Sequence, residues 1–136
     1  MQSDVIVVLD NIRSGHNVGS LMRTCDGLGA SKLYLCGITP HPRVGGDQRP
    51  EHVIRANTKE INKTALGAQE MVAYEYSPDA QALIPSLQDD GYKVYCLENN
   101  VTGTKSLKQV KTSGRIALVL GSETDGIGPE VLSLAD

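Results

Sequence analysis

The sequence contains no tryptophan and no phenylalanine, so its capacity for aromatic stacking rests on five tyrosines. That number argues against a module that binds single-stranded nucleic acid mainly by stacking bases on aromatic rings. An excess of basic residues is lacking too, because the formal net charge at pH 7 is −3. A broad basic surface for RNA is therefore not expected, and any RNA contact would depend on a local basic patch or on a second subunit.

Cysteine is scarce as well, and its spacing does not suit a metal site. Cys25, Cys36 and Cys96 are odd in number and lie in apolar contexts, so we expect reduced, buried thiols in a cytoplasmic protein. No apolar run approaches the length of a membrane span, and the first residues lack the basic and apolar regions of a signal peptide. We therefore expect no metal, no membrane segment and no secretion signal.

Short apolar runs alternate with amphipathic segments along the chain. Strands are expected over 5–9, 32–36, 74–76, 93–97 and 116–120, and helices over 18–28, over 51–72, after 77–79 and from 129. Pro85 lies inside the third helical segment and should kink it or divide it. This alternation predicts an α/β fold with a mostly parallel sheet and helices on both faces, and 136 residues suffice for a single domain.

The segment 10–24 contains a glycine-bearing turn between the strand over 5–9 and the helix over 18–28. An apolar stripe on that helix consists of Val18, Leu21, Met22, Cys25 and Leu28. Arg23 points away from the stripe, so the scaffold would hold its guanidinium without burying it, which suits contact with a phosphate or a hydroxyl. Asn17 is suited to cap the helix, and Gly19 is suited to let another backbone approach closely.

A second turn follows the apolar run 116–120 and contains Gly121, Glu123, Gly126 and Gly128. Pro129 is placed to be the first residue of a helix. Ligands of open α/β sheets bind outside the carboxyl ends of the strands, where both turns should lie. The sequence therefore predicts a ligand site to which both turns contribute.

In this order, the two turns resemble those of the SpoU family of RNA ribose methyltransferases, within the SPOUT superfamily. The matching positions are Asn17, Gly19, Arg23, Thr24 and Gly29 in the first pattern, and 118–123, Gly126, 129–132 and 135–136 in the second. The segment 63–70 resembles part of some members too. The resemblance implies a homodimeric, cytoplasmic enzyme that transfers a methyl group from S-adenosylmethionine to a ribose 2′-hydroxyl of tRNA or rRNA. It does not indicate which RNA or which nucleotide.

The same resemblance makes Arg23, Asn17 and Glu123 the candidate catalytic residues. In the family, the arginine contacts the phosphate of the acceptor nucleotide and is proposed to help activate the 2′-hydroxyl. A guanidinium keeps its proton at neutral pH, so it is an unlikely base. Orientation of the acceptor and stabilisation of a developing alkoxide are the more defensible roles for Arg23.

By resemblance, Leu97, Glu98 and Gly121 would line the S-adenosylmethionine site, mainly through backbone groups. The candidate RNA contacts are Arg13, His16 and Arg23. A further basic-rich stretch contains Arg43, Arg49, His52, Arg55 and Lys59. This stretch could grip RNA, or it could be a solvated face, because Asp47 and Glu51 interrupt it.

The family has a third pattern, which closes its trefoil knot and supplies much of the cofactor pocket. The sequence ends at Asp136, where that pattern should begin. By resemblance we expect a single SpoU-type domain over 1–136 that is truncated at its C-terminus and has an incomplete knot, or a naturally degraded relative. Two other functions stay open: an inactive SPOUT-like remnant that binds RNA or a protein partner, and a generic nucleotide-binding α/β domain.

Overall fold

The computed structural model describes residues 4–99 and 103–136. Within these residues, one sheet of five parallel strands has the order β3-β2-β1-β5-β4. The strands are β1 (Asp4–Asp10), β2 (Lys32–Cys36), β3 (Tyr74–Ser77), β4 (Lys93–Cys96) and β5 (Arg115–Leu120). The helices are α1 (Gly15–Leu28), α2 (Glu51–Ala65), α3 (Ala80–Asp89) and α4 (Pro129–Leu132), with the short 3₁₀ turns η1 (Ala68–Glu70) and η2 (Leu107–Gln109). The expected α/β fold with a parallel sheet is confirmed.

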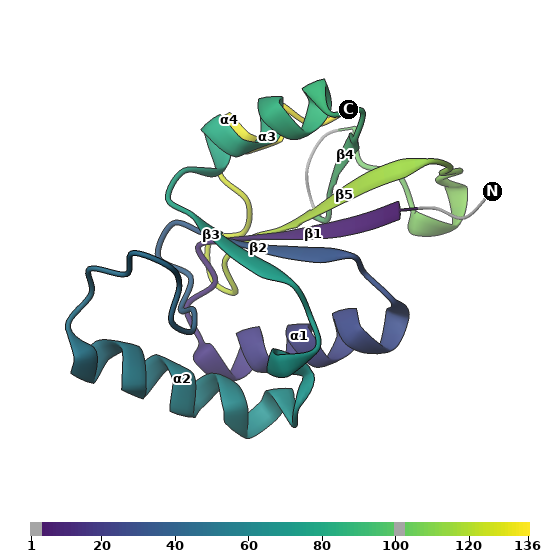
Figure 1. Ribbon diagram of the computed structural model, residues 1–136. Helices are drawn as coiled ribbons and strands as arrows, with labels where there is room; N and C mark the ends of the chain where they lie inside the picture. The colour runs from purple at the N-terminus through teal and green to yellow at the C-terminus, as the bar shows by residue number, and fades with distance from the viewer. Residues whose placement is uncertain (1–3, 100–102) are drawn as a thin grey trace.

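The helices cover both faces of the sheet, with α1 and α2 below it and α3 and α4 above it in Figure 1. β1 lies at the centre of the sheet, and helices cover both of its faces. Because successive side chains of a strand point to opposite faces, they enter different cores. Leu9 packs in the core under α1 and α2, whereas Val8 packs in the core under α3 and α4, and both are fully buried. Burial on both faces explains why this strand reads as a continuous apolar run.

α1 begins earlier than expected, at Gly15. Ser14 caps it, because its hydroxyl oxygen accepts a hydrogen bond of 3.2 Å from the backbone N–H of Asn17. The expectation that Asn17 is the N-cap is therefore wrong, and its side chain is available for another contact. Gly29 ends the helix in the left-handed region, as expected. Leu28 is 82% exposed and does not join the apolar stripe, because a helical wheel gives the direction of a side chain but not the reach of the sheet that covers it.

α1 and α2 pack closely at Gly19. A Cβ atom at this position would lie 2.1 Å from the backbone oxygen of Ile61 and 2.2 Å from the Oγ1 atom of Thr64. The expected close approach of another backbone at Gly19 is therefore confirmed. α2 ends at Ala65, short of the expected boundary, because the next two residues both have positive φ and η1 replaces the rest of the helix.

α3 runs through Pro85 as one helix, so of the two expected effects, a kink or a division, the division is not observed. Pro85 lies on the exposed side of α3, where water can satisfy the carbonyl that loses its N–H partner. Asp79 caps the helix, and its Oδ1 atom accepts a hydrogen bond of 2.9 Å from the N–H of Gln81. α3 thus carries the chain across the sheet, from the edge strand β3 to the opposite edge strand β4.

The three cysteines carry free thiols. Cys25 and Cys36 are buried, but Cys96 is only partly buried, which corrects the expectation for that residue. Desolvation raises the pKa of Cys36 to about 12 and that of Cys96 to about 11, so neither thiol is a ready nucleophile. In the part of the chain that the structure describes, no helix is both long and apolar enough to cross a membrane.

Candidate active site

Glu123 connects the loop after β5 to the start of α1. Its Oε1 atom accepts a hydrogen bond of 3.0 Å from the backbone N–H of Arg13, and Oε2 accepts one of 3.2 Å from the N–H of Ser14. Oε2 also accepts a hydrogen bond of 2.8 Å from the side-chain amide of Asn17. One carboxylate therefore brings together the two turns that the sequence singled out, at the carboxyl edge between β1 and β5.

The surroundings of Glu123 favour its ionised form. Desolvation acts to raise its pKa, but hydrogen bonds from the Arg13 N–H, the Asn17 amide and the Ser14 N–H outweigh it and hold the pKa below its usual value. The Glu123 carboxylate therefore lies in front of the N-terminal end of α1, where the helix dipole also stabilises a negative charge. Glu123 is therefore a charged anchor at neutral pH and is not placed to act as a general acid.

Arg13 lies at the rim of this cluster. Its guanidinium reaches Asp125 in the same loop as Glu123, with 3.5 Å between Nη2 and Oδ2. The two side chains are 60% and 75% exposed, so the ion pair is weak. The Arg13 guanidinium can therefore exchange this partner for another anion. Asp125 is a neighbour that the sequence analysis did not identify.

Arg23 lies apart from the cluster. It is exposed in the middle of α1, six positions after Asn17, and this offset corresponds to about 9 Å along a helix axis. α1 connects two parallel strands, so it must run back from the carboxyl edge of the sheet toward the amino edge. Within one chain, this path carries Arg23 away from the strand end at which Glu123 lies.

His16 turns toward α2 and not toward Glu123. Its Nε2 atom lies 3.7 Å from the Oε2 atom of Glu60. Its backbone oxygen accepts a hydrogen bond of 2.6 Å from the hydroxyl of Thr64. These two contacts fasten the first turn of α1 to the C-terminal half of α2.

The three candidate cofactor residues lie together at the carboxyl ends of β4 and β5. A Cβ atom at Gly121 would lie 2.5 Å from the backbone nitrogen of Ile127, so the loop returns directly onto this glycine. The N–H of Ile127 donates a hydrogen bond of 2.8 Å to the Oε2 atom of Glu98. Leu97 donates its N–H to the backbone oxygen of Val119 at 3.0 Å, and the residue is 42% exposed. The edge thus offers apolar surface beside a carboxylate and tightly held backbone.

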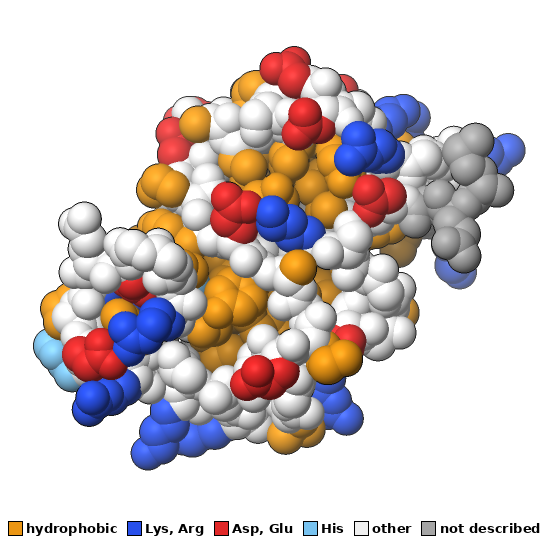
Figure 2. All heavy atoms as spheres, in the orientation of Figure 1, with side chains coloured by type: hydrophobic (Ala, Val, Ile, Leu, Met, Phe, Trp, Pro, Cys, Tyr) orange, Lys and Arg blue, Asp and Glu red, His pale blue; other side chains and the backbone are white. Residues whose placement is uncertain are grey.

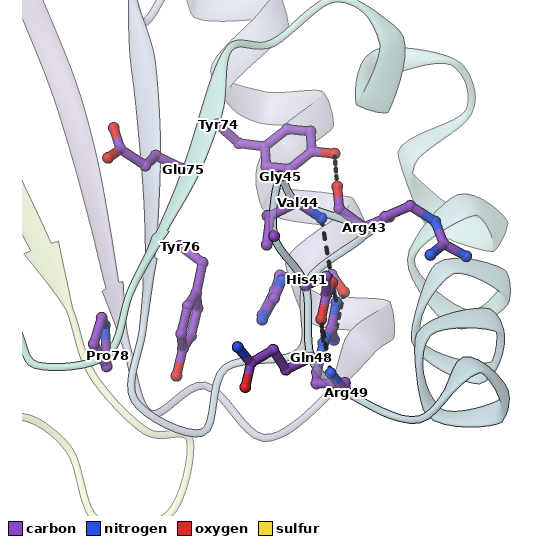
Figure 3. A pocket seen from close by; sticks show the side chains of 12 residues that line it. His41, Arg43, Val44, Gly45, Gln48, Arg49, Tyr74, Glu75, Tyr76 and Pro78 are labelled. Carbon is purple, nitrogen blue, oxygen red and sulfur yellow. Dashed lines mark hydrogen bonds and ion pairs between the residues drawn. The ribbon is translucent and has the colours of Figure 1, made fainter.

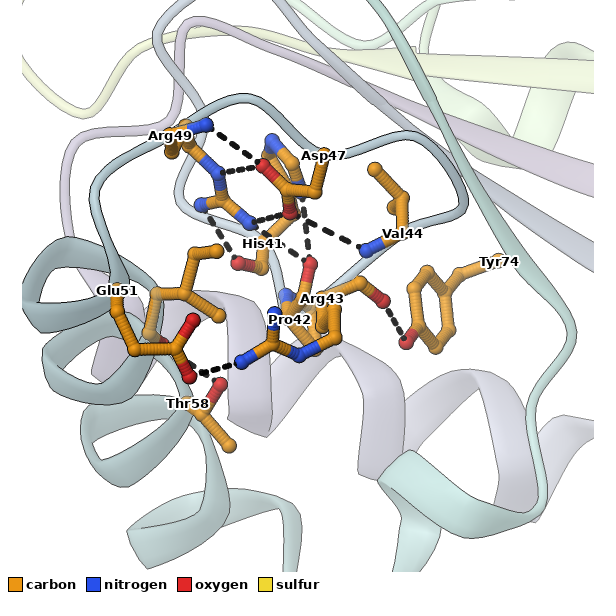
Figure 4. Close-up of polar contacts among 10 residues, drawn as sticks. His41, Pro42, Arg43, Val44, Asp47, Arg49, Glu51, Thr58 and Tyr74 are labelled. Carbon is orange, nitrogen blue, oxygen red and sulfur yellow. Dashed lines mark hydrogen bonds and ion pairs between the residues drawn. The ribbon is translucent and has the colours of Figure 1, made fainter.

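The loop over 37–50 is clamped by an arginine whose role the sequence analysis did not identify (Figure 4). Arg49 donates hydrogen bonds to both carboxylate oxygens of Asp47, at 3.0 and 2.7 Å, and to the backbone oxygens of His41 and Pro42, at 2.9 and 3.0 Å. The Arg49 side chain is the main reason that the pKa of Asp47 lies far below its usual range. The available signal was an aspartate two residues before an arginine in a glycine- and proline-rich loop, a spacing that allows an Asx turn.

The clamped loop and the edge strand β3 enclose a cavity of about 960 Å³ (Figure 3). The His41 ring stacks on Tyr76 with 4.2 Å between the ring centroids. The hydroxyl of Tyr76 donates a hydrogen bond of 2.9 Å to the backbone oxygen of Gly37, and that of Tyr74 donates one of 3.0 Å to the backbone oxygen of Arg43. The described residues contain no group of three side chains that could hold a metal ion.

Comparisons with known proteins agree with this architecture. Residues 48–136, more than half of the chain, match the model of the SpoU rRNA Methylase family. A tRNA (guanosine(18)-2′-O)-methyltransferase of Thermus thermophilus is 26% identical over 135 residues, which cover 99% of this chain and 61% of that protein. A 23S rRNA (guanosine-2′-O-)-methyltransferase of Coxiella burnetii is 27% identical over 123 residues, which cover 90% of this chain and 43% of that protein. The chain therefore spans less than two thirds of the length of these relatives.

Solved structures show the same fold. The TrmH/SpoU tRNA modifying enzyme of Aquifex aeolicus superposes with a TM-score of 0.71 at 23% identity, over 99% of this chain and 60% of that one. The SpoU methyltransferase AviRb of Streptomyces viridochromogenes, in complex with AdoMet, superposes with a TM-score of 0.73 at 18% identity, over 100% of this chain and 48% of that one. These likenesses show the fold, and the match to the family model over residues 48–136 shows the family. The chain belongs to the SpoU rRNA methylase family.

Proposed function

We propose that the protein is an RNA methyltransferase that transfers a methyl group from S-adenosylmethionine to a ribose 2′-hydroxyl of tRNA or rRNA. Its membership of the SpoU family supports this proposal. The names of the relatives in Thermus thermophilus and Coxiella burnetii support it too, one being a tRNA enzyme and the other a 23S rRNA enzyme. Both names specify methylation of a 2′-oxygen of guanosine.

The observation that carries the proposal is the use of the N-terminal end of α1 by Glu123. In a generic nucleotide-binding turn, the free N–H groups at such a helix end bind the phosphate. Here the N–H groups of Arg13 and Ser14, which immediately precede α1, donate to the Glu123 carboxylate, so an anion of the protein itself lies in front of the helix end. The same carboxylate accepts a hydrogen bond from the Asn17 side chain. Asn17 belongs to the first SpoU pattern and Glu123 to the second. This arrangement favours the methyltransferase over a generic nucleotide-binding domain.

The edge formed by Leu97, Glu98 and Gly121 fits S-adenosylmethionine chemically. The exposed part of Leu97 offers apolar surface to an adenine ring, and the Glu98 carboxylate offers acceptors to a cationic ligand. When bound, this cofactor supplies a methyl group on a positively charged sulfur atom. The contribution of the chain is alignment, because the contact at Gly121 and the Glu98–Ile127 hydrogen bond keep the loop edges in place.

We assign the acceptor side of the reaction to Arg23. Its exposed guanidinium can hold a phosphate of the RNA and would stabilise the negative charge that develops on the 2′-oxygen. Asn17 and Glu123 act as positioning residues, since they fasten the start of α1 to the loop after β5. Arg13 and His16 lie on the same turn and are assigned to RNA contact.

We further propose that the protein acts as a homodimer in the cytoplasm. α1 carries Arg23 away from the cofactor edge of its own chain, so a second subunit whose cofactor edge faces α1 would complete a site. The family resemblance supports such a pairing. The cytoplasm is the compartment in which bacterial tRNA and rRNA substrates of the named relatives are found.

The test is methyl transfer from tritium-labelled S-adenosylmethionine to tRNA and to rRNA, followed by digestion to nucleosides. We expect the label in 2′-O-methyl nucleosides of one of the two RNA classes. Cofactor binding is measured separately by calorimetry. Cofactor binding without transfer to either RNA, or label found on bases, would contradict the proposed reaction.

A further inference from the structure

We propose that the outer face of α2 and the clamped 37–50 loop form an accessory RNA-binding surface, with a cationic groove for backbone phosphates and an adjoining cavity for one nucleobase. The identity of the ligand rests on the proposed function, because RNA is the substrate class assigned there. The surface is separate from the cluster around Glu123. Its role would be to hold the substrate RNA beyond the nucleotide that is methylated.

The cationic groove has a volume of about 560 Å³ and lies along α2. Arg43 from the loop and Arg55 and Lys59 from α2 line it, and all three side chains are exposed. Arg55 and Lys59 are four residues apart, so they lie on the same side of the helix. Figure 2 shows Lys and Arg side chains gathered at the lower left, over α2 and the loop.

The charge of the groove favours an anion. Among the described residues that line it, Glu51 is the one acidic side chain. Its carboxylate contacts Arg43 and lies 3.7 Å from the Nε atom of Arg55. One carboxylate cannot neutralise three cations, and exposed ion pairs of this kind are weak enough for a phosphate to replace them. This local positive excess contrasts with the net charge of −3 of the sequence, and it suits a polyanion such as RNA.

The 960 Å³ cavity adjoins the groove, because Arg43 and Tyr74 line both. Gln48 is exposed, and in Figure 3 its side chain extends toward the Tyr76 ring. A carboxamide offers both a donor and an acceptor to the edge of a base, and an aromatic ring offers a surface for stacking. Burial lowers the pKa of His41, which stacks on Tyr76, so this wall is neutral at pH 7. An uncharged base suits such a cavity better than a phosphate does.

The loop between groove and cavity is organised before any ligand binds. The Arg49 side chain is 22% exposed and its guanidinium donates to four oxygen atoms of the loop, so it is a clamp and not a phosphate ligand. The Tyr74 hydroxyl holds the backbone of Arg43 at 3.0 Å. A preorganised loop loses less conformational entropy on binding than a free one.

The accessory surface also lies within reach of the candidate site. Glu60 contacts His16, and it is the residue that follows Lys59 in α2. Packed helices such as α1 and α2 have axes about 8–10 Å apart. A single RNA strand can therefore pass from Arg13 and His16 across α2 into the groove.

The experiment measures binding of a fluorescein-labelled oligoribonucleotide of mixed sequence by fluorescence anisotropy at several salt concentrations. The groove variant is Arg55→Gln with Lys59→Gln, and the control is Lys108→Gln with Lys111→Gln, an equal charge change at the far edge of the molecule. Loss of two phosphate contacts should flatten the slope of log K against log salt by about 1.4. Gln48→Ala should weaken binding by about threefold to tenfold, and it should leave binding of an abasic oligomer of the same length unchanged.

Several outcomes would overturn the inference. One is that the groove and control pairs have equal effects on RNA binding, and another is that the effect of Gln48→Ala persists with the abasic oligomer. The others are that the wild type binds no RNA, or that polyglutamate binds with the same dependence on the groove pair. The last outcome would assign the surface to an acidic protein partner. Methyl transfer is measured independently, so RNA binding through the groove without transfer would contradict the proposed function and leave this inference standing. Methyl transfer that is unaffected by the groove pair would support the proposed function and contradict this inference.

Discussion

The side-chain amide of Asn17 donates a hydrogen bond of 2.8 Å to the Oε2 atom of Glu123, across 106 positions of the sequence. The contact is possible because Ser14, and not Asn17, caps α1. It connects the turn after β1 to the loop after β5, two strands that are neighbours in the sheet. The bond therefore turns two sequence patterns into one cluster.

The first prediction concerns the replacement Asn17→Asp. It exchanges the amide donor for a carboxylate close to Glu123, and two like charges at this distance raise the pKa of one of them and destabilise the folded state. We expect a lower melting temperature for Asn17→Asp than for Asn17→Ala at pH 7. The difference between the two melting temperatures should shrink below about pH 5, because protonation relieves the repulsion. Thermal melts at the two pH values measure this. Equal losses for both variants at both pH values would show that the contact carries no charge.

The second prediction is the pH dependence of the Glu123 anchor. The folded-state pKa of Glu123 lies below the ordinary value of 4.5, so the unfolded chain binds this proton more readily. The stabilisation is therefore fully present above about pH 4.5 and is lost as the pH falls below it. We expect the stability gap between wild type and Glu123→Gln to be constant from pH 5 to 7 and to shrink toward pH 3. Denaturant melts of the wild type and Glu123→Gln across this pH range measure the gap, and a gap that stays constant down to pH 3 would contradict the prediction.

The third prediction compares two glycines of α1. Gly19→Ala should destabilise the protein by about 1–3 kcal/mol or more, because the new methyl group overlaps the backbone of α2. Gly27→Ala meets no atom within 4 Å and should stabilise the helix by about 0.5–1 kcal/mol. Urea denaturation of both variants gives these values. A Gly19→Ala protein as stable as the wild type would refute the tight crossing of α1 and α2.

The fourth prediction concerns Arg23. Arg23→Ala should lower the rate of methyl transfer by about 100-fold to 1,000-fold, since it removes a contact to the charge that develops in the transition state. Binding of S-adenosylmethionine should stay unchanged, because Arg23 is assigned to the acceptor and the proposed cofactor edge would hold its ligand mainly through backbone groups, which the Arg23 charge does not affect. Transfer assays and calorimetry are compared with Lys108→Ala. Transfer within a few-fold of the wild type would remove Arg23 from the reaction.

The fifth prediction tests the cofactor edge. A methyl group at Gly121 would lie 2.5 Å from the backbone of Gly126 and Ile127, so Gly121→Ala must displace the loop. We expect S-adenosylmethionine binding to weaken by about tenfold or more, which corresponds to roughly 1.4 kcal/mol. At Gly128 the nearest atom is 3.5 Å away, so Gly128→Ala should bind the cofactor as the wild type does. Equal affinities for the two variants would place the cofactor elsewhere.

Much of the fold could be predicted because its signals are local. β1 and β5 are central strands covered by helices on both sides, and such strands appear in the sequence as continuous apolar runs. Gly29 ends α1 in a conformation that glycine adopts at little cost, and Pro129 is the first residue of α4. The SpoU-type patterns are contiguous segments too, so they could be recognised without knowledge of the sheet. The truncation and the state of the knot stay predictions from resemblance.

Only the tertiary structure decided the contacts between segments that are distant in the chain. The sequence marked Asn17, Glu123 and Arg23 as one set, but the strand order joins the first two and the reversal of α1 carries the third away. The clamp of Arg49 on the His41 and Pro42 carbonyls likewise depends on how a folded loop closes. Backbone preferences and burial act over a few residues and leave a pattern in the sequence. The pairing of remote side chains depends on the order of the strands and the direction of each crossover, which no short stretch of residues encodes.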